Sequence, residues 1–572
     1  MAETPRQCPG PLLPGHVVRG DMFLLAALCL ACFLITPIWY PLLDEDEPRY
    51  VSTSLNMLES GDFLVPRFND EPRYQKPVLT YWVMAASMAL VGEEPMGGWE
   101  WPARLPSGLA ATGIALLLYG TLARRQSRRA GWIAALGFVS LPMVMLWARA
   151  ASTDMLLTLL LTATVLCAWW AAEAARGRAK ALYLLAAACA GLGFLTKGPV
   201  GALLPLLIWG VHLGLTGRLR SESRRVPWLG AVAVFSIVGL SWYVAIYLAE
   251  GPAFFRSFFL RENLGRALTG AGGPKEILSW ARLIVPTMVL VGLAPCSAFA
   301  LAALTRRPSQ SGPPLGHPKH LLHVWFWVAL IVFSLPQGQW PSYALPIAPA
   351  ACLLAASYLD ESARARDGHL GPWAGAAGLA VFWVVVLTVT VGLAQSASPE
   401  YSKGLPVPLL STLMLATAAI IAIGTAGAVV ARVRATQPAA VGILLATWIL
   451  GFGLFAQVTA PVLVRHLTGP RVAIGRYLAE RGPDLPVLTY GARYSSLPFY
   501  AREPLEFHAK GSASFGQRVD RLRSDEGLLL VTDPGGRGEL KDRWPMETVV
   551  DTERLLLLRI PPVDMPPASP GP

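Results

Sequence analysis

Long runs of apolar residues recur along the 572-residue chain and constrain its fold more than any other feature. Most are about 15–25 residues long, the length of helix that crosses a hydrocarbon core of about 30 Å. Backbone polar groups in that core must pair within the protein, and these runs lack the alternation of barrel strands, so helices are expected. Only 15% of the residues are charged, against roughly a quarter in a soluble domain. The chain is therefore predicted to be an all-α polytopic membrane protein.

About thirteen spans are predicted. They cover residues 22–39, 102–122, 131–148, 154–173, 180–196, 202–215, 227–249, 282–304, 321–336, 342–359, 372–394, 406–431 and 439–460. The first ends in ITPIWYPLLDEDEPRY with no small-residue cleavage site, so we interpret it as a retained helix and not as a signal peptide.

The apolar stretch 78–92 is ambiguous, and the charges around it decide its placement. If it crossed the membrane, RRQSRR at 124–129 would lie outside, against the positive-inside rule. We therefore expect it to lie along the interface, which leaves the N-terminus and the basic loops in the cytoplasm. These loops account for the net charge of +11, so no nucleic-acid partner is expected.

The predicted domains follow from this topology. Residues 1–21 form a cytoplasmic tail, residues 22–460 form the transmembrane domain with a first outer loop at 40–101, and the rest lies outside. Strand-like runs (PVLTY, GLLLVTD, TERLLLLRI) alternate with helix-like SSLPFYA and SFGQRVDRL, which indicates a small α/β domain over 461–560 on the non-cytoplasmic side. The proline-rich end, 561–572, is predicted to be disordered. The cysteines are interpreted as small hydrophobic residues, since none of them shows metal-ligand spacing.

The outer loops hold nearly all the unusual motifs. In the first loop, four acidic residues at 44–47 precede Arg49 and Tyr50, and VSTSLNMLESGD reads as a short helix stopped by Gly61. A partly desolvated carboxylate at a membrane surface can act as a base or bind a cation. Arg73 and Lys76 follow, and they could hold a phosphate. The alternative is a solvated polar loop.

Two further charges stand at the outer ends of predicted spans. Asp154, in ARAASTDMLL, is either a helix N-cap or a second catalytic carboxylate facing Asp46. Lys197, in FLTKGPVG, runs against the charge bias of an outer loop. It either extends to the interface or binds an anionic headgroup.

Aromatic residues accompany arginines in a later outer loop. FFRSFFLRENLGRALTG brings Arg256, Arg261 and Arg266 beside several phenylalanines, a composition that suits an interfacial helix on an anionic lipid. SLPQGQWPSYALP places Tyr343 at the mouth of another span. Either segment alone is also compatible with an interfacial aromatic anchor.

Taken in order, these motifs resemble a known family. DE-P-RY, SGDFLVPRFN and RYQKPVLTYW are similar to the first periplasmic loop of bacterial lipid-A aminoarabinose transferases, which belong with the protein O-mannosyltransferase-like GT-C glycosyltransferases. FLTKGPVGALLP, ENLGR, QWPSYALPIAPA and YSSLPFYAR also look like family segments, so the resemblance runs from about residue 40 to 505.

This resemblance implies an inverting transferase of the bacterial inner membrane. Such enzymes move a sugar from a polyprenyl-phosphate carrier to a lipid or protein acceptor at the outer face. By position, Asp46 is the acidic residue nearest the reaction, and Arg49 and Tyr50 complete its motif. Lys76 and Arg266 are similar to residues that bind the carrier phosphate. The cavity residues would be Tyr343 and Lys197, with Asp154 as a second acidic position.

One departure bears on cofactors. The family often has Glu-Lys-Pro where this chain has Gln75-Lys76-Pro77, and that glutamate contributes to a divalent-metal site in the aminoarabinose enzyme. Gln is a poorer ligand for Zn²⁺. A metal requirement is therefore doubtful, and no cofactor is assigned. A nucleotide is not needed either, because a polyprenyl-phosphate sugar is already activated.

Three alternatives remain open from the sequence. The acceptor could be a protein hydroxyl or another envelope glycan in place of lipid A. A polytopic transporter or flippase is a second reading, although transporters place charges near the bilayer midplane and these spans are almost uncharged there. A non-enzymatic assembly protein is the third.

Overall fold

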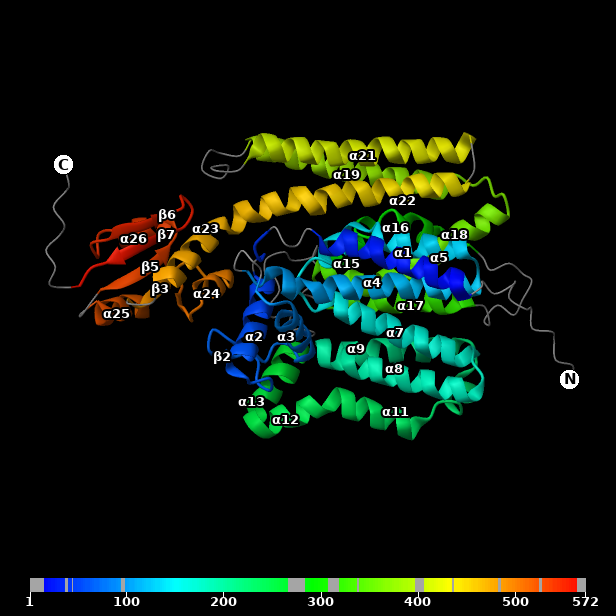
Figure 1. The fold of residues 1–572 in the computed structure, drawn as a ribbon, viewed down its shortest axis with the longest axis horizontal. Coiled ribbons are helices and arrows are strands. Elements are labelled where there is room, and N and C mark those ends of the chain that lie inside the picture. Colours follow the sequence, from blue (N-terminus) through cyan, green and yellow to red (C-terminus); the bar gives the residue numbers. More distant parts are fainter. Residues whose placement is uncertain are drawn as a thin grey trace, which may run out of the picture.

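A computed structural model of the protein shows a bundle of long helices joined to a small α/β domain (Figure 1). The residues described are 15–35, 40–43, 45–93, 98–265, 283–306, 318–336, 339–396, 406–434, 437–481, 485–523 and 527–562. The α/β domain lies at one end of the bundle, which we call the domain end. The opposite end, where the chain enters helix α1, is called the distal end.

Within the described residues, nine helical stretches are long and apolar enough to cross a membrane. They are α1 (Gly15–Leu34), α4 (Glu100–Arg125), α7 (Asp154–Glu173), α8 (Arg176–Lys197), α11–α12 (Trp228–Glu250), η5–α18 (Pro341–Arg364), α19 (Gly371–Ser396), α21 (Val407–Arg434) and α22–α23 (Gln437–Glu480). A tenth is formed if the bent pair α15 (Ile284–Val291) and α16 (Cys296–Thr305) counts as one span. The protein is thus a multi-pass membrane protein.

The remaining predicted spans coincide with shorter or broken helices. They are α5 (Arg128–Val139) with α6 (Pro142–Trp147), α9 (Pro199–Leu215) and α17 (Pro318–Ser334). Pro142 begins α6 because its ring fits the first turn of a helix but not the interior. Within the described residues, all thirteen predicted segments are therefore helical, although not all satisfy the length criterion of a single straight span.

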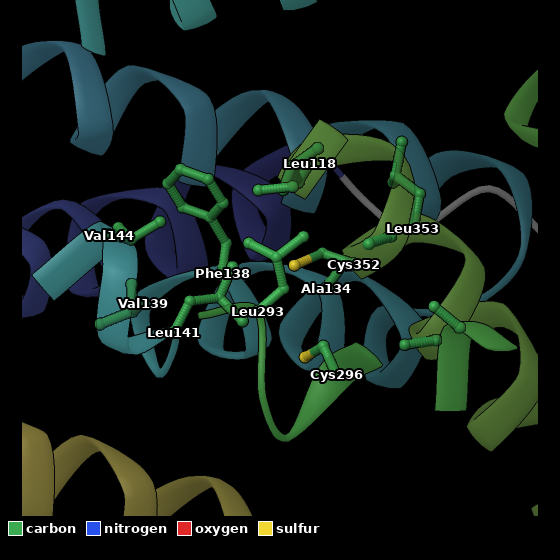
Figure 2. Close-up of a cluster of buried hydrophobic side chains, with 14 of the residues drawn as sticks. Leu118, Ala134, Phe138, Val139, Leu141, Val144, Leu293, Cys296, Cys352 and Leu353 are labelled. Atoms are coloured by element: carbon green, nitrogen blue, oxygen red, sulfur yellow. The ribbon is translucent and has the colours of Figure 1, made fainter. Parts of the chain in front are cut away.

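The bundle core is packed by small and aliphatic side chains from several helices. Figure 2 shows Leu118 of α4, Phe138 of α5 and Leu353 of α18 around Leu293, all of them buried. Cys296 and Cys352 lie in the same cluster as free, buried thiols. Close packing of this kind, and not the hydrophobic effect, holds helices together where lipid already surrounds them.

Three short elements cover the domain end of the bundle. Helix α2 (Asp46–Ser60) stops at Gly61, whose φ of 71° gives the left-handed cap that glycine adopts without strain. A hairpin of β1 (Arg67–Phe68) and β2 (Glu71–Pro72) follows, and then α3 (Leu79–Val91) packs against α2. Helix α3 is 13 residues long, too short for a straight crossing of about 20 residues.

The C-terminal α/β domain contains a five-stranded sheet of order β4-β3-β5-β7-β6. Its strands are β3 (Val487–Tyr490), β4 (Glu506–His508), β5 (Leu528–Thr532), β6 (Glu547–Asp551) and β7 (Leu556–Ile560). Strands β4, β3 and β5 are parallel, while β7 runs antiparallel to both β5 and β6. The helices α24 (Ser496–Ala501), α25 (Ala513–Leu522) and α26 (Pro534–Leu540) complete the domain.

This domain docks on the first loop through the YSSLPFYAR segment. Tyr500 is buried, accepts a hydrogen bond from the Leu42 amide at 3.0 Å and donates one to Glu100 Oε1 at 2.9 Å. Asn69 exchanges two hydrogen bonds with the backbone of Leu505, at 2.9 and 2.8 Å. The docking therefore fixes the domain against the part of the chain that holds the acidic motif.

Candidate functional site

An ion pair marks the domain end of two spans. Asp154 is the first residue of α7 and Lys197 the last residue of α8, and these helices pack along their length. Lys197 Nζ lies 2.6 Å from Asp154 Oδ1, and each side chain is 15% exposed. Gly198 has a φ of 72°, so the chain can turn into α9 directly after Lys197. Asp154 is thus a partner of Lys197, and the N-cap position belongs to Thr153.

Tyr343 completes this part of the site. It lies in η5 (Pro341–Ile347), and its ring centroid is 5.1 Å from Lys197 Nζ. A cation at this distance from an aromatic ring is attracted by the electron-rich face. Asp46 lies near enough to Lys197 for the two charges to interact.

Asp46 begins helix α2 at the mouth of this cluster. Its side chain is 66% exposed, and Arg49 lies one turn later with its guanidinium 3.9 Å from Asp46 Oδ1. Arg49 also contacts Glu45 at 3.3 Å and donates from Nε to Ser495 Oγ of the α/β domain at 2.8 Å. The Asp46 carboxylate is therefore accessible and loosely held, while Arg49 is held by Glu45 of the first loop and by Ser495 of the α/β domain.

Tyr50 lies behind Asp46 and is buried. Arg73 stacks over its ring, 5.3 Å from the centroid, and donates to the Tyr81 hydroxyl at 2.9 Å. Burial raises the pKa of Tyr50 well above its ordinary value, and the charges of Asp46 and Asp154 raise it further. Tyr50 is consequently a neutral hydroxyl that shares its surroundings with both carboxylates.

Glu47 and Arg104 form a buried pair that the sequence motifs do not predict. Arg104 of α4 donates from Nε and NH2 to Glu47 at 3.0 and 2.8 Å, and it also binds the carbonyls of Tyr40 and Pro41. Glu47 in turn accepts from the Ala151 amide at 2.7 Å. This pair ties α2, α4 and the loop before Asp154 together, and its only sequence signal was an arginine inside an apolar run.

Lys76 is half-buried just before α3, three residues after Arg73. Its neighbour Gln75 is exposed. Tyr74 donates to Glu250 Oε2 at 2.5 Å, and burial together with this hydrogen bond raises the pKa of Tyr74 to about 12. The start of α3 is thereby attached to the end of α12 (Ser241–Glu250).

The residues described do not form a metal site. No group of three His, Cys, Asp or Glu side chains among them is arranged to hold an ion. Gln75 offers only a neutral amide at the position where the resemblance implies a glutamate.

The structure thus brings together Asp46, Arg49, Tyr50, Asp154, Lys197 and Tyr343, with Lys76 on the adjoining segment. Arg266 lies outside the described residues, and so do the side chains of Arg261 and Glu262. Of the Phe-rich segment, α13 (Pro252–Phe255) and the π-helical stretch η3 (Arg256–Gly265) are helical, as expected. Phe254 and Phe258 stack and are buried, whereas Phe255 and Arg256 are exposed.

The comparison of this chain with protein families and with known relatives agrees with the resemblance seen in the motifs. Residues 75–242 match the family model described as dolichyl-phosphate-mannose-protein mannosyltransferase. The chain is 30% identical over 341 residues to an undecaprenyl phosphate-alpha-4-amino-4-deoxy-L-arabinose arabinosyl transferase of Pseudomonas fluorescens, covering 57% of this chain and 53% of that protein. The enzyme of the same name from Proteus mirabilis is 27% identical, with 64% and 66% covered. The chain therefore spans about half to two-thirds of the length of these relatives.

The fold has a solved counterpart. It matches the crystal structure of ArnT from Cupriavidus metallidurans bound to undecaprenyl phosphate, with a TM-score of 0.79 and 22% identity, over 94% of this chain and 98% of the other. The predicted fold class, a GT-C type membrane domain with a small C-terminal α/β domain, is confirmed by this match.

Proposed function

We propose, from the mannosyltransferase-family match and the geometry of the site, that this protein is an inverting glycosyltransferase. It moves a sugar from a polyprenyl-phosphate carrier to an envelope acceptor at the outer face of the bacterial inner membrane. The relatives named as arabinosyl transferases make 4-amino-4-deoxy-L-arabinose the first candidate sugar, and lipid A is the first candidate acceptor. The N-terminus would then be cytoplasmic, and the domain end would face the periplasm.

The observation that carries this proposal is an exposed carboxylate beside a group of cations at one end of a membrane bundle. Asp46 is accessible, with Arg49 next to it and Lys197 within electrostatic range. A lipid carrier lying in the membrane would present its phosphate and sugar at this depth. The cluster therefore has the charges needed for an anionic leaving group and for an acceptor that must be oriented.

The cations would stabilise the departing phosphate. In the transfer, an acceptor oxygen attacks the anomeric carbon, the bond from that carbon to the carrier phosphate breaks, and polyprenyl phosphate leaves with the electron pair. Lys197, Lys76 and Arg266 are proposed to hold the charge that develops on this phosphate. A single displacement of this kind inverts the anomeric centre.

Asp46 would act on the acceptor. A hydroxyl acceptor would give up its proton to the Asp46 carboxylate as the new bond forms. A lipid phosphate is already anionic, and Asp46 would then orient the sugar and need not remove a proton. Tyr343 and Tyr50 would line the sugar subsite, and Asp154 would keep Lys197 in place.

The domains would divide this work. Residues 22–460 are proposed to form the catalytic membrane domain, residues 461–560 a periplasmic domain that docks on the first loop, and residues 1–21 a cytoplasmic tail. Reporter fusions that placed residues 461–560 in the cytoplasm would contradict this arrangement.

The experiment that tests the function is mass spectrometry of envelope lipids and glycoproteins from cells with and without the gene. Loss of an aminoarabinose mass from lipid A, restored by wild type but not by Asp46→Asn at equal protein level, is expected. A protein acceptor is the second candidate, because the matching family model describes a protein mannosyltransferase. Loss of a glycan from proteins with unchanged lipid A would favour it.

A further inference from the structure

A cleft lies where the α/β domain meets the membrane helices, away from the site described above. It has a volume of about 450 Å³, and it is bounded by Pro406 at the start of α21, by α23 (Ala460–Arg481) and by the β6–β7 turn. Arg465 and His466 of α23 and Arg554 of the turn bring basic groups to it, and among the described residues that line it Glu553 is the one acidic residue.

None of the described residues that line the cleft belongs to the site described above. Gly475 of α23 packs directly against Tyr500 of α24, which carries the docking contact with the first loop. Gly475 follows His466 by nine residues, about two and a half turns at 3.6 residues per turn, and so lies on the opposite side of the helix. The cleft is therefore a separate place on the molecule.

The position of the cleft along the bundle axis matches the headgroup layer of a bilayer. α22 (Gln437–Leu454), the π-helical stretch η6 (Phe455–Thr459) and α23 form one continuous helical run that starts at the distal end (Figure 1). At 1.5 Å per residue, Val462 and His466 lie about 38 and 44 Å along it from Gln437. A bilayer is about 40–45 Å thick with its headgroups. Both residues thus reach the headgroup level at the domain end.

Apolar surface continues from the cleft toward the membrane centre. Leu409, one turn after Pro406 on α21, is 49% exposed, and Val458, one turn before Val462, is 40% exposed. In a bilayer these exposed side chains would face lipid. A basic cleft above an exposed apolar surface fits a molecule that has an anionic head and acyl chains.

The turn that closes the cleft has an unusual backbone. Glu553 has a φ of 67°, a left-handed conformation that residues other than glycine rarely adopt. Its amide is held by Asp551 Oδ1 at 2.6 Å, and Thr552 closes the turn through Leu555. Such residues persist only where the surrounding structure holds them in place, and they cluster at binding sites.

We propose that this cleft binds the headgroup of a phosphate-bearing lipid of the leaflet at the domain end. The guanidinium groups of Arg465 and Arg554 would hold the phosphate, while the acyl chains lie along Leu409 and Val458. Since the lipid would contact α21, α23 and the β6–β7 turn together, its binding would fasten the α/β domain to the bundle. This site does not depend on the proposed transferase activity.

The test uses the purified full-length protein in detergent. Phosphatidylglycerol and phosphatidylcholine with the same acyl chains are added separately, and bound lipid is counted by native mass spectrometry. Wild type should retain one phosphatidylglycerol at concentrations where phosphatidylcholine is lost. The double variant Arg465→Gln/Arg554→Gln should bind phosphatidylglycerol about tenfold more weakly. The control Arg178→Gln/Arg220→Gln, which removes two exposed arginines at the distal end, should bind it like wild type.

A second variant is expected to change lipid affinity in the opposite direction, and it serves if the double variant folds poorly. Glu553→Gln removes the acidic group of the cleft and should tighten phosphatidylglycerol binding several-fold. Equal retention of the two lipids, wild-type binding by the double variant, or no gain with Glu553→Gln would overturn the proposal. So would displacement of the lipid by millimolar inorganic phosphate, because the cleft would then be a site for a free anion.

Discussion

Asp360 at the distal end of the bundle and Asp46 at the domain end show two different uses of an aspartate at a membrane surface. Asp360 is fully buried and accepts hydrogen bonds from Gln126, Ser127 and Arg129 at 2.9–3.0 Å, and it pairs with Arg364 at 2.8 Å. Asp21 is likewise held by both arms of Arg128 at 2.6 Å, with Tyr119 as a further partner. These carboxylates have their hydrogen-bonding positions filled by protein groups, and they hold neighbouring helices and loops together.

The domain end contains both kinds of carboxylate side by side. Glu47 is buried and saturated by Arg104 and two backbone amides, as at the distal end. Asp46, the residue before it, is exposed and has its nearest described cation 3.9 Å away. Adjacent acids in one motif therefore differ: Glu47 holds helix α2 in place, whereas Asp46 is exposed and is proposed to act on a substrate.

The largest effect is expected from Asp46→Asn. Because Asp46 is proposed to orient or deprotonate the acceptor, transfer should fall by about 10²–10⁴-fold. The unfolding midpoint should stay unchanged, since the side chain is exposed. Initial rates of sugar transfer and thermal unfolding in detergent measure both quantities. Glu45→Gln, an exposed neighbour in the same motif, serves as the control and should keep most of the activity.

Glu47→Gln should chiefly destabilise the protein. The substitution leaves Arg104, which is 1% exposed, as a buried cation without its carboxylate, and such changes cost about 3–5 kcal/mol. A matched control is Glu173→Gln, which breaks the partly exposed pair with Arg125 and should cost no more than about 1 kcal/mol. Equal losses in the unfolding transition for the two variants would remove the distinction between buried and exposed pairs.

Lys197→Met should lower kcat/KM for the sugar donor. Loss of one cation beside the leaving phosphate is expected to reduce kcat/KM by about 10–100-fold, in line with roughly 1.5–3 kcal/mol for a hydrogen bond to a charged group. Variation of the polyprenyl-phosphate sugar concentration separates KM from kcat. An unchanged kcat/KM for the donor would take Lys197 out of its proposed role.

Asp360→Asn should have the smallest effect on sugar transfer, and it tests the distal end. Its arginine partners are 36% and 54% exposed and can turn toward water, so we expect a stability loss of only about 1–3 kcal/mol. The transfer rate per folded molecule should equal that of wild type. A reduced rate at full folding would show that the buried carboxylates of the distal end act on the reaction, which would contradict a purely structural role for them.

Much of the fold could be predicted from composition and local pattern. The thirteen apolar runs coincide with helices in the part of the chain that the structure describes, and Gly61 correctly marked the end of α2. In the α/β domain, the three apolar strands were predicted, whereas β4 and β6 were missed. These two are the edge strands of the sheet, and their exposed positions carry polar residues, so the apolar pattern that identifies a central strand is absent.

The site was predictable in its members but not in its contacts. Asp154 and Lys197 stood out as charges at span ends, yet their pairing depends on how α7 and α8 pack. The pairing of Glu47 with Arg104 joins residues 57 positions apart. It depends on α2 folding back onto α4, which no local pattern records.

The central claim is that Asp46 lies at a sugar-transfer centre, and purified protein tests it most directly. The protein is incubated with undecaprenyl-phosphate aminoarabinose and lipid A, and both products are quantified by mass spectrometry. Wild type should release undecaprenyl phosphate and form modified lipid A in equal molar amounts, and Asp46→Asn should form neither above background. Product formation by Asp46→Asn at the wild-type rate, or movement of the donor across a vesicle membrane with no glycosyl product, would contradict the account.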